Sequence, residues 1–366
     1  MPSIEGGGVE KNFFIISNFL SKKIENISII TTSQNIKKKL NNKIKLISLQ
    51  NNFWNNLGRR KKFIICSIML FFELIKNRNS IILSFQGNAY CSLICKLFSS
   101  KVIIRSNTSP SGWSKSKIKI FLYKIFYGIS DEIIVNSYEF KKEFKKKFKL
   151  NSTCIYNPLN KKEINKLSKK KIEFKFFKKN YLNIVSVARL SDQKDHLTLL
   201  KAINDLKDII KIRLLLVGSG NQLKKLNEYI NKKKIFNIVK IIQFQKNPFP
   251  YIAKSNLFIL SSKYEGLPNV LLEALTLKKF VIASNCPTGP KEILDNGKSG
   301  FLFNIGNKNE LKNKILFFWN NKRRCKKMTL NGFKRLNRFD NHLNLNKYYR
   351  LIKKYKIKIE LIKKIE

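Results

Sequence analysis

Short apolar runs alternate with longer amphipathic and polar stretches along most of the chain. In the first half, the strand-like runs cover residues 27–31, 44–49, 81–85, 102–104 and 132–135. Apolar, β-branched runs of about four to eight residues that alternate with helical stretches are typical of parallel α/β structure. The pattern therefore predicts a βα succession in this part of the chain.

The second half repeats this alternation with clearer boundaries. A buried-strand pattern starts at residue 182 and is followed by a polar loop and a helix that we expect to begin near His196. Further apolar runs cover residues 213–217, 239–244 and 256–262. A chain of 366 residues is above the size at which one hydrophobic core usually divides, so two α/β domains are predicted.

Two carboxylates eight positions apart, Glu265 and Glu273, flank a Gly-Leu-Pro turn and the expected start of a helix near Asn269. A helix start offers free backbone N–H groups and a positive dipole end, which favour a bound diphosphate. With an axial rise of ~1.5 Å per residue, the two carboxylates are up to ~12 Å apart and could reach hydroxyls on opposite sides of a diphosphate. The alternative is a helix that carries two surface acids.

Arg189 and Lys194 follow the strand that starts at residue 182. Ligands of open α/β sheets bind beyond the carboxyl ends of the strands, so these cations are placed to neutralise a diphosphate, unless they are ordinary surface cations. Gly218 and Gly220 end another strand in a Gly-Ser-Gly turn. That turn alone is a weak signal, because glycine after a strand often serves only a positive φ.

The block at residues 264–275, with the sequence YEGLPNVLLEAL, resembles the E-x7-E motif of family 4 glycosyltransferases of the bacterial surface-polysaccharide type. The blocks around Arg189 and Lys194, the turn at residues 218–220 and the segment 286–294 follow in the family's order over about residues 183–303. The resemblance implies retaining enzymes with the GT-B fold, in which two doubly wound, Rossmann-like domains face a central cleft. It implies neither a cofactor nor a metal ion.

The resemblance also implies roles for individual residues. Arg189 and Lys194 would stabilise the leaving diphosphate and Glu265 would hold the donor hexose, so these three are the expected catalytic residues. Glu265 is not expected to act as a glycosidase-type nucleophile. The expected donor-binding residues are Gly218, Gly220, Gly266, Leu267, Pro268, Asn269 and Glu273.

The beginning of the chain resembles the acceptor domain of the family. Gly7 and Gly8 precede an apolar-periodic helix through Leu20 and match the G-G-x-E turn, with a flexible glycine tail as the alternative. A doubly wound domain should have a strand directly before this turn, and only residues 1–5 precede it. We predict that the reading frame starts upstream of Met1 or that the protein is impaired, because this strand normally lies centrally in the sheet.

Other residues are expected to line the cleft with Gly7 and Gly8. Arg105 and Asn107 follow one predicted strand, and Ser137 follows another. Several family members carry a donor-contacting His near the first of these loops. This loop contains no His, so Asn107 or Thr108 would substitute and no catalytic base is assigned.

The expected domain boundaries follow from polar and Lys-rich composition. We predict an acceptor-binding domain over residues 1–158, a linker over 159–180, a donor-binding domain over 181–340 and a C-terminal segment over 341–366. In the family, a final helix often crosses back to the first domain. Residues 343–365 could supply it, although their Ile/Lys pattern is not cleanly helical.

The chain is strongly basic, with 74 Lys and Arg against 23 Asp and Glu and a formal net charge of +51. Nucleic-acid binding would explain the charge but not the ordered strand–loop motifs, and a bias toward AT-rich codons would also produce it. Basic runs lie at residues 37–39, 59–62, 141–142, 145–147 and 169–171. Because a basic face attracts anionic lipid, we expect peripheral attachment to the inner face of the cell membrane and no nucleic-acid partner.

The six cysteines show no C-x2-C spacing and no partnered His cluster, which indicates a reducing compartment and no metal site. The most apolar run, residues 63–75, is too short to span a bilayer and is favoured as a core helix over a membrane-dipping one. The N-terminus lacks the apolar segment of a signal peptide. A cytoplasmic location is expected.

The resemblance implies a retaining enzyme that moves a hexose or N-acetylhexosamine from a nucleoside diphosphate sugar, expected to be a UDP-sugar, and the basic first domain favours a lipid-linked glycan as acceptor. The product would enter a surface polysaccharide such as O-antigen, lipopolysaccharide or capsule. The alternatives are a GT-B enzyme that acts on a soluble sugar or sugar phosphate, a noncatalytic GT-B subunit, and a basic nucleic-acid-binding protein.

Overall fold

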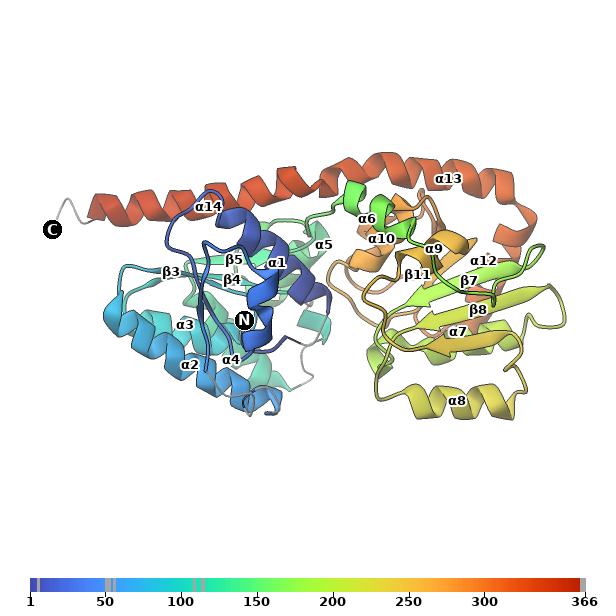
Figure 1. Cartoon of the computed structure of the whole chain (residues 1–366), viewed down its shortest axis with the longest axis horizontal. Helices are drawn as coiled ribbons and strands as arrows, with labels where there is room; N and C mark the ends of the chain where they lie inside the picture. Colours follow the sequence, from blue (N-terminus) through green and yellow to red (C-terminus); the bar gives the residue numbers. More distant parts are fainter. Residues whose placement is uncertain (5–6, 50–53, 55–56, 108–109, 113–115, 363–366) are drawn as a thin grey trace. The chain divides into compact units, whose positions relative to one another are not determined.

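The computed structural model describes residues 1–4, 7–49, 54, 57–107, 110–112 and 116–362. The chain forms two compact units, which Figure 1 shows in colours that follow the sequence. Unit 1 comprises Met1–Pro158 and Asn341–Glu366, and unit 2 comprises Leu159–Asp340. Both units are built from parallel sheets covered by helices, which confirms the predicted two-domain α/β class.

Unit 1 contains two parallel sheets. The four-stranded sheet has the order β3–β4–β5–β6, with β3 (Ile81–Ser84), β4 (Lys101–Arg105), β5 (Glu132–Val135) and β6 (Thr153–Cys154). A separate two-stranded sheet pairs β1 (Ser28–Ile30) with β2 (Lys45–Ile47), and the 3-10 helix η1 (Gln34–Lys39) connects them. The five strand-like runs predicted in the first half correspond to β1 to β5.

Residues 1–4 lie against the ends of both sheets without forming a strand. The backbone N–H of Ser3 donates to Gln86 Oε1 beyond β3 at 3.1 Å, and Thr32 Oγ1 beyond β1 donates to the Pro2 carbonyl at 3.0 Å. The helix α1 (Gly8–Leu20) follows them, as the sequence predicts.

Helices cover both faces of the four-stranded sheet. One face packs against α1 and the last helix, α14 (Asn341–Ile362), through Ile103 and Ile134. The other face packs, through Val102, Ile104 and Val135, against four helices. These are α2 (Arg59–Lys76), α3 (Asn88–Leu97), α4 (Lys117–Gly128) and α5 (Tyr138–Phe148), and the 3-10 helix η3 (Pro110–Gly112) precedes α4. Successive residues of β4 face opposite layers because strands have a period of two.

Unit 2 contains one parallel sheet of six strands in the order β12–β11–β10–β7–β8–β9. The strands are β7 (Leu182–Val187), β8 (Ile212–Val217), β9 (Val239–Ile242), β10 (Leu257–Leu260), β11 (Phe280–Ser284) and β12 (Phe301–Phe303). Its helices are α6 (Lys161–Ser168), η4 (Asp192–Lys194), α7 (His196–Asn204), α8 (Leu223–Lys232), α9 (Phe249–Lys254), α10 (Asn269–Thr276), α11 (Pro290–Ile293), α12 (Lys308–Asn320), α13 (Lys322–Arg335) and η5 (Leu336–Phe339).

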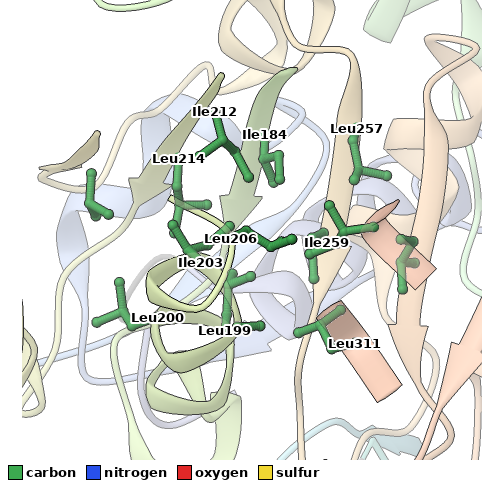
Figure 2. Close-up of a cluster of buried hydrophobic side chains, with 14 of the residues drawn as sticks. Ile184, Leu199, Leu200, Ile203, Leu206, Ile212, Leu214, Leu257, Ile259 and Leu311 are labelled. Carbon is green, nitrogen blue, oxygen red and sulfur yellow. The ribbon is translucent and has the colours of Figure 1, made fainter. Parts of the chain in front are cut away.

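The core of unit 2 lies between the sheet and the helices α7 and α12 (Figure 2). Ile184 of β7, Leu214 of β8 and Ile259 of β10 pack with Leu199 on α7 and Leu311 on α12, and all five side chains are fully buried. This apolar layer fixes the strands rigidly, so the loops at their carboxyl ends start from defined positions.

Residues 159–180 differ from the sequence-based expectation, whereas the C-terminal segment does not. Residues 159–180 contain α6 and belong to unit 2, whereas a polar linker was expected. The C-terminal segment forms the regular helix α14 and belongs to unit 1. Its buried residues Leu345, Tyr348 and Tyr355 lie on one helical face, and this amphipathic pattern is hidden in the sequence by the surrounding Ile and Lys residues.

The prediction of a core helix over residues 63–75 is correct for only one side of α2. Cys66, Leu70 and Leu74 are buried, but Phe72 is 59% exposed and Ile64 is 54% exposed. Within the part of the chain that the structure describes, no helix combines the length and the apolar character required to cross a membrane.

Candidate functional site

The strand order of unit 2 contains one point at which the chain changes direction across the sheet. From β7 the chain proceeds to β8 and β9 on one side, whereas β10, β11 and β12 lie on the other side. The two central strands are paired directly, Ile184 with Leu257 and Val185 with Phe258. In open parallel sheets, ligands bind beyond the carboxyl ends of the strands at such a point. The loops that follow β7 and β10 therefore form the candidate site.

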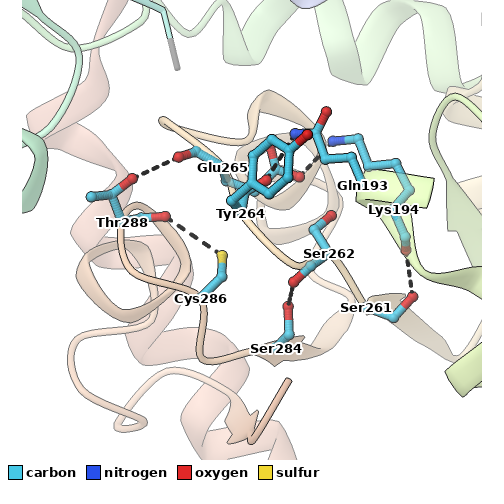
Figure 3. Close-up of polar contacts among 9 residues, drawn as sticks. All are labelled: Gln193, Lys194, Ser261, Ser262, Tyr264, Glu265, Ser284, Cys286 and Thr288. Atoms are coloured by element: carbon cyan, nitrogen blue, oxygen red, sulfur yellow. Dashed lines mark hydrogen bonds and ion pairs between the residues drawn. The ribbon is translucent and has the colours of Figure 1, made fainter. Parts of the chain in front are cut away.

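Lys194 and Glu265 meet at this point. Lys194 ends η4 after β7, and Glu265 follows β10. The Nζ atom of Lys194 lies 2.5 Å from Oε1 of Glu265, as Figure 3 shows. The side chains are 18% and 8% exposed, so the ion pair is shielded from bulk water but remains accessible. Two of the three expected catalytic residues are thus in direct contact.

Hydrogen bonds fix the backbone around this ion pair (Figure 3). Gln193 Nε2 donates to the Tyr264 carbonyl at 2.8 Å, and the buried Thr288 hydroxyl donates to the Glu265 carbonyl at 2.7 Å. Ser261 Oγ donates to the Lys194 carbonyl at 2.9 Å. The sequence analysis did not assign Gln193 or Thr288. Both lie inside the motif blocks, but only the fold shows which carbonyl each one binds.

Gly218 and Gly220 allow the loops after β7 and β8 to touch. A Cβ atom on Gly218 would lie 1.9 Å from the Ala188 carbonyl oxygen, and one on Gly220 would lie 2.2 Å from the Leu190 carbonyl oxygen. Any larger residue would displace the loop that carries Arg189. The two glycines, which were expected to bind the donor, therefore also fix the position of an expected catalytic residue.

Gly289 plays the same part between the loops after β10 and β11. Its φ is +94°, and a Cβ atom there would lie 2.3 Å from the Gly266 carbonyl oxygen and 2.7 Å from Pro268 Cδ. Gly289 lies in the family-like segment 286–294, and the sequence alone predicts no individual role for it. The sequence signal for it is the glycine between two prolines at residues 287–290.

Arg189 lies beyond β7 with an exposed side chain. Across the described residues, no acidic side chain forms an ion pair with it. The neighbouring Lys263, by contrast, binds both carboxylate oxygens of Asp192 at 2.8 Å. Arg189 is therefore an uncompensated positive charge on the same loop after β7 as Lys194.

The expected helix after the Gly-Leu-Pro turn is α10, and it starts at Asn269. Gly266, Leu267 and Pro268 are buried between Glu265 and the helix, and Glu273 lies on the helix with 6% exposure. The two carboxylates of the E-x7-E motif are thus held on the loop and on the first turns of α10.

In unit 1, Gly7 and Gly8 start α1. The backbone N–H of Gly7 donates to Oε2 of Glu10 at 2.6 Å, so the carboxylate of the G-G-x-E turn caps its own helix. The flexible-tail alternative is wrong for these two glycines. Gly6 and Thr108 lie outside the described residues.

The side chain of Arg105, which was expected to line the cleft, is fully buried in unit 1. Arg105 Nε donates to the Tyr348 hydroxyl at 2.7 Å, and Nη2 donates to Asn157 Oδ1 at 2.5 Å. Nη1 donates to Asn107, and the guanidinium lies over the ring of Phe85. Arg105 therefore connects β4 to α14 and to Asn157, which lies one residue before the first segment of unit 1 ends at Pro158.

Asn107 and Ser137 are also bound within unit 1. Asn107 Nδ2 donates to the Phe85 carbonyl at 2.9 Å, and its side chain is half-buried. Ser137 is fully buried and caps α5, because its Oγ accepts from the Phe140 N–H at 3.1 Å. Ser137 thus has a structural role as the N-cap of α5.

Two buried titratable side chains adjoin the ion pair. Burial, together with the negative charge of Glu265, raises the pKa of the Cys286 thiol to about 12, so this thiol is neutral. Burial, together with the positive charge of Lys194, lowers the pKa of His196 to about 4, so the imidazole is neutral near pH 7. The cysteines are free thiols, and no cluster of His, Cys, Asp and Glu that could hold a metal ion occurs among the described residues.

Comparisons with known proteins agree with this geometry. Residues 168–335 match the family model described as glycosyl transferases group 1. An uncharacterized glycosyltransferase of Methanocaldococcus jannaschii is 38% identical over 186 residues, which are 49% of this chain and 46% of that protein. The chain therefore aligns with about half the length of this relative.

A longer alignment joins this chain to a Campylobacter jejuni alpha-1,4-N-acetyl-D-galactosaminyltransferase that is named for a GalNAc-containing PP-undecaprenol substrate. It is 26% identical and covers 93% of both chains. Among solved structures, HepE of Anabaena in complex with UDP-glucose has a TM-score of 0.76 at 17% identity and covers 97% of this chain and 98% of that one. Residues 168–335 thus resemble the group 1 glycosyltransferases, and the two α/β units of the chain have the GT-B fold.

Proposed function

We propose that the chain is a retaining glycosyltransferase that transfers a hexose or N-acetylhexosamine from a UDP-sugar to a lipid-linked glycan. The observation that carries the proposal is the contact of Lys194 with Glu265 at the point where the strand order of unit 2 reverses, with the exposed Arg189 on the same loop as Lys194. The Glu265 carboxylate can accept hydrogen bonds from the hydroxyls of a sugar, and the two cations can neutralise the diphosphate. A sugar diphosphate requires both.

The cations would act on the leaving group. When the bond between the anomeric carbon and the diphosphate oxygen breaks, negative charge grows on that oxygen. Arg189 and Lys194, already in place, would stabilise it together with the N-terminal end of α10. An acceptor hydroxyl oxygen would bond to the anomeric carbon from the same face, and its proton would pass to an oxygen of the leaving diphosphate.

The carboxylates would position the donor. Glu265 would accept a hydrogen bond from a hexose hydroxyl while Lys194 keeps its carboxylate oriented. Glu273, held on α10, would accept from the ribose. Thr288 and Gln193 would act through the backbone of this loop and not through the substrate. In this role, Glu265 is a binding group whose removal costs orientation of the donor.

Two relatives support the substrate classes. The Campylobacter jejuni protein is named for a diphospho-undecaprenol glycan, and this supports a lipid-linked acceptor for the present chain. The HepE structure contains UDP-glucose, and this supports a UDP-sugar as donor. The product would then belong to surface polysaccharide assembly at the inner face of the cell membrane.

The first test is hydrolysis of UDP-, GDP- and ADP-sugars by the full chain in the presence of EDTA. We expect release of UDP from one donor, and we expect Glu265→Ala and Arg189→Ala to lower the rate by about 100-fold, the usual cost of one transition-state contact. Glu273→Ala should mainly weaken UDP-sugar binding. Glu228→Ala, which removes an exposed carboxylate on α8, is the matched control and should leave the rate unchanged. Absence of both turnover and nucleotide binding in the wild type would overturn the proposal.

A further inference from the structure

One side of unit 1 exposes large apolar side chains over three neighbouring helices. The helices α2, α3 and α4 pack next to one another on the same face of the four-stranded sheet. Their outer sides expose a set of residues that we call the apolar face: Ile64, Ile68, Phe71, Phe72, Ile75, Tyr90, Leu93, Leu97, Ile118, Phe121, Leu122 and Ile125. Each of these side chains is at least 40% exposed. They make up more than half of the exposed large apolar residues in the described part of the chain.

The apolar face is continuous between α2 and α3. An open hollow of about 350 Å³ lies there, lined by Ile64, Ile68, Phe71, Phe72, Tyr90 and Ile94 together with Ser67. Aromatic contacts hold its walls, since the Phe71 ring lies 5.1 Å from that of Phe98. Large contiguous patches of exposed apolar side chains commonly mark interaction sites.

The charges on these three helices are positive with one exception. The three helices carry Arg59, Arg60, Lys61, Lys62, Lys76, Lys96, Lys117, Lys119 and Lys124, and the single acidic residue in their sequences is Glu73. Lys and Arg are shared about equally by the two units, so the total charge does not distinguish this surface. What distinguishes it is the shortage of acidic residues beside exposed apolar side chains.

Two of these helices place cations where they oppose helix stability. The first turns of α2 and α4 contain Arg59, Arg60, Lys117 and Lys119 and no acidic residue. The N-terminal end of a helix is the positive end of its dipole, so cations there are unfavourable unless an anion compensates them. An anionic partner would remove this repulsion and at the same time cover the apolar face.

We propose that the apolar face docks the chain on an anionic lipid bilayer. Helices that lie in the plane of a membrane surface place apolar side chains at the boundary of headgroups and acyl chains, and the basic residues at their edges bind lipid phosphates. This surface would bring unit 1 to the leaflet that contains the lipid-linked acceptor. The inference relies on the proposed function only for that acceptor, because the surface itself is defined by exposed side chains and charge.

The test measures binding of the full chain to phosphatidylcholine vesicles with and without phosphatidylglycerol. The variant Phe72→Ser/Leu97→Ser/Phe121→Ser changes one exposed residue on each helix. The matched control, Ile209→Ser/Phe236→Ser/Phe244→Ser, changes three equally exposed residues of unit 2. On anionic vesicles, we expect the partition coefficient of the first variant to be at least about tenfold lower than that of the wild type. The control should have the same partition coefficient as the wild type. Binding should also weaken in vesicles without phosphatidylglycerol and at high salt.

Equal binding of both variants, or no binding of the wild type to anionic vesicles, would overturn the proposal. A wild-type dimer that the first variant dissociates, without vesicle binding, would assign the apolar face to contact between two copies of the chain and would also overturn it. UDP binding is measured on the same three proteins. Loss of UDP binding in all of them would reject the proposed function, whereas loss of vesicle binding alone would concern only the docking surface.

Discussion

Among the individual residues, burial and one neighbouring charge determine which side chains of the site carry charge. Lys194 and Glu265 balance each other in a shielded ion pair, whereas Arg189 is exposed and uncompensated. Cys286 and His196 lie close to the pair but are neutral near pH 7, because burial opposes their charged forms. An incoming diphosphate would therefore meet Arg189, which has no ion-pair partner among the described residues, and Lys194, which is already paired with Glu265.

His196 predicts how stability depends on pH. Its pKa is about 4 in the folded chain against an ordinary value of 6.5, so between these values the unfolded chain binds a proton that the folded chain does not. Stability should therefore fall as the pH drops from about 6.5 to about 4, by a total of about 3 kcal/mol through this residue, and His196 should have no effect above that range.

The measurement compares urea unfolding at about pH 7.5 and about pH 5 for the wild type and for His196→Gln. The variant should lose this part of the pH dependence. His342→Gln changes the other histidine of the chain, which is exposed, and should behave like the wild type. An unchanged pH dependence in His196→Gln would show that this imidazole is not the group responsible.

Among the secondary-structure elements, the site depends on contacts between loops that follow different strands. The loops after β7 and β8 meet at Gly218 and Gly220, and those after β10 and β11 meet at Gly289. These contacts hold the loops that carry the expected catalytic residues. They leave no space for a Cβ atom on Gly218, Gly220 or Gly289. Substitution of Gly289, which is not among the expected donor-binding residues, should therefore affect the site without changing a group that contacts substrate.

Gly289→Ala should lower the free energy of unfolding by about 1–3 kcal/mol more than Gly306→Ala, because its Cβ would overlap the Gly266 carbonyl. Gly306 is the matched control, since its φ of +74° is also positive but no atom lies within 4 Å of an added Cβ. Denaturant unfolding measures the difference, and calorimetry should show weaker UDP binding for Gly289→Ala alone. Equal losses in the two variants would mean that backbone conformation, and not the loop contact, causes the effect.

Much of the element structure could be predicted from local pattern. The strands β1 to β5 and the starts of α7 and α10 follow from apolar runs and turn residues, since the period of apolar positions is a local property. Whether an apolar face is covered depends instead on distant parts of the chain. The core-helix prediction for residues 63–75 failed on one side of α2 for this reason, and α6 was missed because its short polar sequence resembles a linker.

The candidate site could also be predicted from the sequence only in part. The motifs identified Lys194 and Glu265, which are 71 residues apart, but not the ion pair between them. For Arg105, the position after a predicted strand indicated a cleft residue, whereas the side chain is directed into unit 1 toward Tyr348, 243 residues further along. A partner at that separation leaves no local signal in the sequence.

Across the whole molecule, unit 1 is assembled from two separate parts of the sequence. Leu345, Tyr348 and Tyr355 of α14 belong to the same apolar cluster as Phe13 and Ile16 of α1. Tyr355 also donates to the Asp131 carbonyl at 2.8 Å. The last helix is thus part of the core of unit 1 and not an appendage.

Tyr348→Phe tests the polar part of this attachment. The variant leaves Nε of the fully buried Arg105 without its acceptor, and a buried donor that loses its partner costs about 1–3 kcal/mol. Tyr349→Phe, at the half-buried neighbouring position, should cost less than this. Chemical denaturation of both variants gives the comparison. Equal stability of the two would show that the hydrogen bond from Arg105 contributes nothing measurable.

The return of α14 to unit 1 has a consequence for the order of events on the ribosome. Unit 2 is continuous in sequence, so all of its strands are available before α14 has been synthesised. The part of unit 1 that is made first must expose the cluster around Phe13 and Ile16 until Leu345 and Tyr348 leave the exit tunnel. The half of the protein that is translated first is therefore the half that finishes folding last, and chaperones would meet it with that apolar surface still uncovered.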